Sequence, residues 1–234
     1  MHLDFPPALK GDNNPNTQEA DPFLNYPYGC CGKALPGTCH GHTDLIDTDE
    51  GKPVVTWAPG QKVNFTLSGN KINSPTENPV GGTHYGGSCQ VGLSTDKGRT
   101  FKVATTWQGN CPLRDGTKDP STQTFDFTVP ADTPAGERVL FAWTWINREK
   151  EFNMNCASVT ISGENSSPEQ PETPASSAAP KPSTTAPRPN MLIAIDYAGA
   201  ECHSKGNPTE LEFPDPGPNV VAGDGEYKLS PPTC

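Results

Sequence analysis

Long apolar runs and clusters of basic residues are both missing from this chain of 234 residues. No stretch of 18 apolar residues occurs, so the sequence predicts no membrane-spanning segment. The 17 Lys and Arg residues are outnumbered by 27 Asp and Glu residues, which leaves a formal net charge of -10. Because nucleic acids and anionic membrane surfaces are polyanions, this charge argues against either of them as a partner.

Helical periodicity and common hydrolase motifs are missing as well. No Ser-His-Asp spacing, phosphate loop or isolated carboxylate pair stands out, so a hydrolase would have to form its site from scattered acids. Period-two alternation recurs instead, and the 27 Pro and 23 Gly favour turns between short strands. The sequence therefore predicts an all-β, immunoglobulin-like or fibronectin-like antiparallel β-sandwich with long irregular loops. The alternating stretches are residues 62–69, 89–94, 124–129 and 138–147.

No C-x-x-C pair occurs, so the eight cysteines are interpreted as disulfides rather than as a zinc site. The simplest partners for Cys202 and Cys234 are each other. Cys30, Cys31 and Cys39 are expected to staple the proline-broken first 50 residues to themselves or to the sandwich. An apolar leader segment is missing at the amino terminus, which indicates a processed form of a secreted protein from an oxidising compartment, extracellular or in the cell wall.

Composition divides the chain into three parts. Residues 164–190 are rich in Pro, Ser, Thr and Ala without one aromatic, which predicts a disordered, extended linker. It separates a sandwich domain at residues 1–163 from a small disulfide-stapled segment at residues 191–234. N-x-[ST] sequons at Asn64 and Asn165 fit a glycoprotein on a secretory route.

Three stretches carry the chemistry. In GGTHYGGSCQ, residues 81–90, glycine pairs flank His84 and leave its ring uncovered, which suits a metal ligand at the surface; the alternative is a turn histidine bonded to backbone. In FAWTWINREKEFNMNCASVTI, residues 141–161, a tryptophan-rich strand, a charged turn and a second strand follow one another. The third stretch is MHLDFPPAL at residues 1–9.

Together these stretches resemble the fungal lytic polysaccharide monooxygenases of auxiliary activity family eleven and their relatives. Residues 39–57 and 211–220 also look like segments of that family. The resemblance implies a secreted monomer that cleaves glycosidic bonds oxidatively in a crystalline polysaccharide, chitin first and β-glucan or cellulose second. It implies copper, an insoluble polysaccharide surface and an external electron donor. The alternative is a non-catalytic protein on the same scaffold that binds the cell wall or copper.

The resemblance also implies a ligand set. In that family the N-terminal histidine binds copper through its α-amine and its ring, and a second histidine, His84 by position, supplies a third neutral nitrogen. The family's axial tyrosine is matched by Asn153. Its neighbour Phe152 is our predicted axial residue because phenylalanine fills that place in related enzymes; otherwise it is a core aromatic. Glu151 matches an acid that orients oxygen species, the alternative being a solvated turn charge.

The amino terminus departs from the family pattern. Family members begin His-Met, so a gapless match places the first ligand immediately before Met1, whereas His2 is the only candidate within the sequence. We favour a histidine preceding Met1 over an N-terminal His2 exposed by removal of Met1, or over a copper-deficient relative.

Two further groups of residues are interpreted as structural. The CHGH pair His40 and His42 has the spacing of a two-histidine metal ligand, but the resemblance makes it a structural segment. Because Cys89 and Cys156 begin strands beside the implied copper site, each is expected in a disulfide, with Cys111 an available partner.

Overall fold

The structure, a computed structural model, describes residues 1–78, 82–163 and 187–234. Short 3-10 turns and strands make up its regular elements, and none of its described helices is long and apolar enough to cross a membrane. The 3-10 turns are η1 (Cys30–Gly32), η2 (Thr38–Gly41), η3 (Thr43–Asp47) and η4 (Pro120–Thr122). The strands are β1 (His2–Phe5), β2 (Thr56–Trp57), β3 (Lys62–Ser68), β4 (Ser88–Ser94), β5 (Lys102–Gln108), β6 (Thr124–Thr128), β7 (Gly136–Ile146), β8 (Phe152–Ile161), β9 (Thr209–Leu211), β10 (Val220–Ala222) and β11 (Lys228–Ser230).

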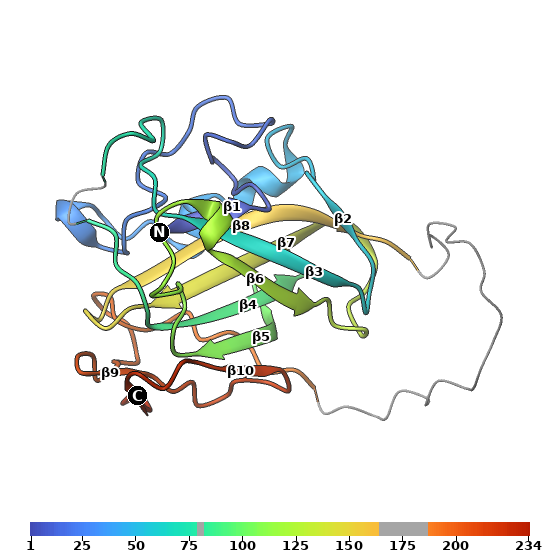
Figure 1. Cartoon of the computed structure of the whole chain (residues 1–234). Coiled ribbons are helices and arrows are strands. Elements are labelled where there is room, and N and C mark those ends of the chain that lie inside the picture. Colours follow the sequence, from blue (N-terminus) through green and yellow to red (C-terminus); the bar gives the residue numbers. More distant parts are fainter. Residues whose placement is uncertain (79–81, 164–186) are drawn as a thin grey trace.

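Two sheets pack face to face, which confirms the predicted β-sandwich. One sheet has the order β1-β3-β6, and the other has the order β10-β5-β4-β7-β8-β2 (Figure 1). The long hairpin of β7 and β8 is antiparallel, with Trp145 opposite Asn153. Strand β4 pairs with β7 so that Cys89 lies opposite Trp145. Strand β4 and the β7–β8 hairpin, which are separate in the sequence, therefore meet at one end of the larger sheet.

The core between the sheets comes from the period-two alternation of the sequence. Alternate side chains of one strand face the same side, so Phe65, Phe125 and Phe127 of the small sheet meet Phe141 and Trp57 of the large one. Ring centroids in this cluster lie 5.0–5.5 Å apart for the three closest pairings, a spacing that aromatic pairs favour.

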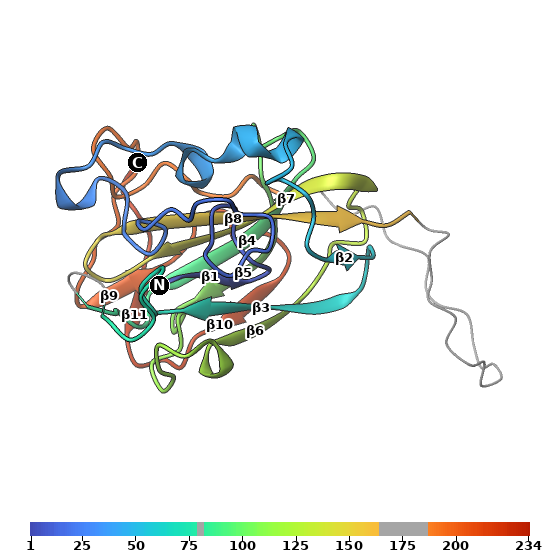
Figure 2. The ribbon, with the colours of Figure 1, turned by 90° about the horizontal axis from the view of Figure 1, so that it is seen from above.

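The outer face of the large sheet is covered as well. The N-terminal loops and the C-terminal segment pack against it, and Met191, Ile195, Leu211 and Phe213 join a second apolar cluster with Phe152. Figure 2 shows these loops and the C-terminal segment lying along the long strands. The segment at residues 191–234 that composition sets apart is thus packed onto the sandwich. Most of the predicted linker, residues 164–186, lies outside the described residues.

Two features differ from the sequence expectations. The sandwich is not wholly antiparallel, because β10 joins β5 and β2 joins β8 in parallel at the two edges of the large sheet. Parallel pairing needs a long connection, which residues 109–219 provide between β5 and β10 and residues 58–151 provide between β2 and β8. The irregular first 50 residues also contain one strand, β1, which pairs with β3.

The disulfides agree with the expectations. Cys202 is bonded to Cys234, and Cys89 is bonded to Cys111. Cys156 in β8 holds Cys39 of the N-terminal loops, which ties those loops to the sandwich. The remaining bond joins the neighbours Cys30 and Cys31.

Candidate functional site

A small cavity of about 130 Å³ lies where β1, the loop before β4 and the β7–β8 hairpin meet. It gathers Met1, His84, Glu151 and Asn153, which are far apart in the sequence. The complete lining is Met1, Asn25, Pro27, Cys30, Cys31, Gly82, His84, Trp145, Glu151 and Asn153.

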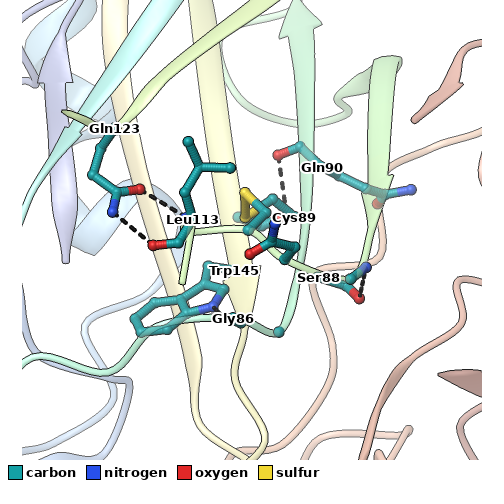
Figure 3. The surroundings of a disulfide bond; sticks show 12 residues. Gly86, Ser88, Cys89, Gln90, Leu113, Gln123 and Trp145 are labelled. Carbon is teal, nitrogen blue, oxygen red and sulfur yellow. Dashed lines mark hydrogen bonds between the residues drawn. A yellow bond between two sulfur atoms is a disulfide. The ribbon is translucent and has the colours of Figure 1, made fainter. Parts of the chain in front are cut away.

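The loop that carries His84 is held from several sides. The indole Nε1 of Trp145 donates a hydrogen bond to the carbonyl of Gly86 at 2.8 Å, and the Cys89–Cys111 disulfide closes the base of the loop (Figure 3). Gly87 has φ +91°, and a Cβ there would lie 2.4 Å from the carbonyl oxygen of Ile146, so only glycine fits. These contacts therefore hold the backbone of the loop, and with it the position of His84.

The His84 ring itself remains accessible. Its side chain is 36% exposed, and its Nδ1 lies 3.6 Å from Oε2 of Glu149, whose side chain is 38% exposed. An imidazole on a fixed loop with an uncovered face is suited to bind a metal ion.

The amino-terminal residue is fixed by β8. Asn155 accepts a hydrogen bond from the backbone N–H of Leu3 at 2.9 Å and donates one to the carbonyl of Leu24 at 2.9 Å. Burial lowers the pKa of the Met1 α-amino group to about 5, and the opposing charge of Glu151 raises it only in part. The amine is therefore neutral at pH 7, which is the form that a metal requires.

The turn between β7 and β8 orients Glu151. The Nδ2 of Asn147 donates a hydrogen bond to Oε2 of Glu151 at 2.6 Å, and Oδ1 of Asn147 accepts one from the Glu151 backbone at 2.9 Å. This reciprocal pair leaves Oε1 of Glu151 available at the cavity.

Asn153 follows two residues later on the same face of the strand. It is 2% exposed, and neither its Oδ1 nor its Nδ2 has a hydrogen-bond partner among the described residues. A buried amide without partners costs free energy, so its place in the cavity wall points to an occupant that hydrogen-bonds or coordinates there.

Phe152 lies on the opposite face of β8. It is 1% exposed and packs edge-on against Tyr28 at a centroid distance of 4.9 Å, with Tyr197 at 5.7 Å. The structure therefore does not bring Phe152 to the cavity. The reason is the alternation of a strand, which turns neighbours to opposite faces. Asn153 occupies the position beside His84 and Met1.

His2 is buried in β1 at 4% exposure, opposite Ser68, and its ring is not part of the cavity wall. Burial, and to a smaller extent the neighbouring N-terminal charge, together lower the pKa of His2 to about 3. The ring Nδ1 has no hydrogen-bond partner in the described part of the chain.

The CHGH pair faces a carboxylate. His42 Nε2 lies 2.9 Å from Oδ2 of Asp21, and His40 Nδ1 lies 3.7 Å from the same oxygen. Across residues 1–78, 82–163 and 187–234, no group of three or more His, Cys, Asp or Glu side chains could hold a metal ion. Any tight metal site at the cavity thus needs backbone or terminal nitrogen beside His84.

Comparison with known proteins decides the family. No protein-family model matches the chain. It is 33% identical over 174 residues to AA11 family lytic polysaccharide monooxygenase A of Aspergillus fumigatus, covering 72% of this chain and 67% of that protein. It is 30% identical over 217 residues to an AA11 family lytic polysaccharide monooxygenase of Aspergillus oryzae, covering 87% of this chain and 46% of that protein. The chain belongs to the AA11 family.

A second Aspergillus fumigatus protein, AA11 family lytic polysaccharide monooxygenase B, is 35% identical over 155 residues, which cover 61% of this chain and 35% of that protein. The chain thus spans less than half the length of two of these relatives. Membership confirms the family predicted from the three sequence stretches, together with its oxidoreductase class.

The cavity of this AA11 member fits a copper ion, the metal that the family implies. It presents the Met1 nitrogen, which is a neutral amine at pH 7 when Met1 is the first residue, together with an accessible imidazole and an unpartnered amide. Sequence reasoning missed the supports: Asn147, which holds Glu151, and Asn155, which holds β1. Both lie within or beside the quoted hairpin motif, but no pattern in one sequence shows which asparagine turns inward.

Proposed function

We propose that this chain is a secreted, copper-dependent lytic polysaccharide monooxygenase that acts on crystalline polysaccharide, with chitin as the first candidate substrate and β-glucan or cellulose second. One observation carries the proposal: Met1, His84 and Glu151 line one cavity although they come from three separate segments. Family membership supports the same chemistry.

Each residue has a defined task in this proposal. His84 and a histidine that precedes Met1, through its α-amine and its ring, would hold copper, which when bound supplies redox chemistry with an external electron donor and dioxygen or peroxide. Glu151, oriented by Asn147, holds or returns a proton at Oε1. Trp145 and Pro27 line the cavity and would exclude water from its inner side.

We further propose that a histidine joined to the Met1 nitrogen completes the ligand set. Met1 lines the cavity and its nitrogen interacts with the charge of Glu151, so a residue attached there would enter the cavity. A terminal amine and ring of the same residue form a chelate that an internal histidine cannot form. His2 is one residue further along β1, roughly 3.8 Å between Cα atoms.

Three forms of the protein test this proposal: one that starts at Met1, one that starts at His2, and one with a histidine before Met1. Copper titration should rank the third form as the tightest. With a reductant it should release oxidised oligosaccharides from chitin, detected by mass spectrometry. Equal, weak copper binding by all three forms and no oxidised product would overturn the monooxygenase assignment.

A second candidate is a copper-binding protein without this activity. The observation in its favour is Asn153, which stands where the family places an axial tyrosine. Tight copper binding by the histidine-initiated form, with no oxidised product from chitin, cellulose or β-glucan, would select this candidate.

Two observations support a location in an oxidising compartment. Every described cysteine is in a disulfide, and Asn64 of the first sequon is exposed on β3. We therefore propose extracellular or cell-wall localisation and glycosylation at Asn64, which intact-mass measurement before and after enzymatic deglycosylation would show.

A further inference from the structure

We propose that Glu210, in the C-terminal segment, is a positioning residue for the His84 loop. Residues 203–234 would then hold the loops that line the metal cavity. The inference rests on the proposed function, because it concerns the same site. It assigns a role to a segment that composition alone sets apart from the sandwich.

The central contact is between a buried carboxylate and the backbone of the loop. Glu210 is 2% exposed, and its Oε1 accepts a hydrogen bond from the N–H of Gly87 at 2.7 Å. Gly87 is three residues after His84 and has the left-handed φ described above. The same carboxylate forms an ion pair with Arg114, which Asp224 of the C-terminal segment also pairs. The charge of Glu210 is thus compensated, as burial requires.

The carboxylate also fills the space under the loop. A Cβ on Gly86 would lie 2.8 Å from Oε1 of Glu210, and one on Gly109 would lie 2.7 Å from its Oε2. Next to this contact, the hydroxyl of Ser88 donates a hydrogen bond to the carbonyl of Leu211 at 2.6 Å. The carboxylate of Glu210 therefore occupies space that a side chain at Gly86 or Gly109 would need, with the Arg114 guanidinium also close to Gly86.

The same segment supports the second loop of the cavity. The N–H of Asn207 donates a hydrogen bond to the carbonyl of Arg148 at 2.8 Å, and the Arg148 guanidinium lies 3.9 Å from the ring centroid of Tyr227. Arg148 precedes Glu149, whose carboxylate faces His84, and lies three residues before Glu151. One segment thus fixes both loops relative to each other.

Removing Glu210 should therefore move His84 without altering any copper ligand. The Gly87 N–H and Arg114 would lose a buried partner, which costs more than the bond itself. Partners that orient metal ligands typically contribute about 10- to 100-fold in metal affinity. A loss of that size is expected for Glu210→Ala.

The experiment uses the full chain with a histidine before Met1. Glu210→Ala and Glu210→Gln are compared with wild type and with Glu212→Ala, a control two residues away whose side chain is exposed. Measurements are copper titration, the electron paramagnetic resonance spectrum of the Cu(II) form, and amide hydrogen exchange of residues 82–88 without metal.

We expect Glu210→Ala to lower copper affinity about 10- to 100-fold, to change the Cu(II) spectrum and to speed exchange at Gly87. Glu210→Gln keeps an acceptor for Gly87 and should recover part of the affinity. Glu212→Ala should match wild type in all three measurements.

Two outcomes would overturn the inference separately from the proposed function. Wild-type affinity and spectrum in Glu210→Ala, with copper bound normally by wild type, overturn the positioning role alone. Equal affinity losses in Glu210→Ala and Glu212→Ala would show a general effect of the segment and also overturn it. Failure of wild type itself to bind copper overturns both the proposed function and the inference.

Discussion

At the scale of single residues, the cavity brings together donors that burial and exposure keep ready for a metal. When Met1 is the first residue, its amine is neutral because it is buried, whereas the His84 ring is accessible because glycines flank it. Both polar atoms of the buried Asn153 side chain lack a hydrogen-bond partner among the described residues. Substitutions of His84 and Asn153 test the roles of the imidazole and of the amide separately.

His84→Ala should abolish tight copper binding in the histidine-initiated form. Because the ring is 36% exposed, the free energy of unfolding of the metal-free protein should change by less than about 1 kcal/mol. Isothermal titration with copper and urea unfolding measure the two quantities. The matched control is His203→Ala, an exposed histidine in the C-terminal segment. Undiminished copper affinity in His84→Ala would contradict the ligand assignment.

Asn153→Leu removes an amide that has no partner, so it should leave the metal-free protein as stable as wild type or more stable. The Cu(II) spectrum should change, because the residue faces the cavity. Asn155→Leu is the matched control: it loses bonds to Leu3 and Leu24 and should lower the free energy of unfolding by about 1–3 kcal/mol. A strongly destabilised Asn153→Leu would show that the amide has partners in solution.

At the scale of elements, the alternation of β8 decides which residues serve the cavity. Cys156 and Phe152 face the outer loops, whereas Asn153 and Asn155 face β1 and the cavity. The sequence patterns predicted most of the long strands, because each alternates apolar and polar residues. They did not predict the inward face at the start of β8, where every residue is buried on both sides and the alternation disappears.

The Cys39–Cys156 disulfide ties the N-terminal loops to β8 across 117 residues of sequence. Replacing both cysteines by alanine should lower the free energy of unfolding by about 2–5 kcal/mol, because a long closed loop restricts the unfolded chain most. The Cys30–Cys31 bond has a sequence separation of 1 and closes no loop of that kind. Its double alanine variant is the control and should lose less than about 1 kcal/mol. Equal losses in urea unfolding would contradict the loop-closure argument.

At the scale of the whole molecule, the large sheet is buried on both faces, and the covering comes from both ends of the chain. Local patterns could not show this, because β10 pairs with β5 and Glu210 reaches Gly87 across more than 110 residues. The sequence motifs point to His84 and Glu151 as candidates, and the structure places both at one cavity. Glu210, in contrast, is one acid among 27 Asp and Glu residues until the fold places it.

Burial of His40 where the N-terminal loops pack against the sandwich should lower the free energy of unfolding at acid pH. His40 is 7% exposed, and burial lowers its pKa from 6.5 to about 4, although Asp21 raises it in part. Between these two values the unfolded chain holds a proton that the folded chain does not. The stability contribution is therefore complete above pH 6.5 and is lost as the pH falls toward 4.

His40→Asn should remove this dependence. Asparagine tolerates the φ of +57° at this position and does not titrate. Between pH 7 and pH 4.5, wild type should lose on the order of 3 kcal/mol more free energy of unfolding than the variant, measured by urea unfolding of metal-free protein. His203→Asn, at an exposed site, should behave as wild type. Parallel pH profiles of wild type and His40→Asn would show that His40 titrates normally in the folded protein, and would move the acid sensitivity to another buried group such as His2.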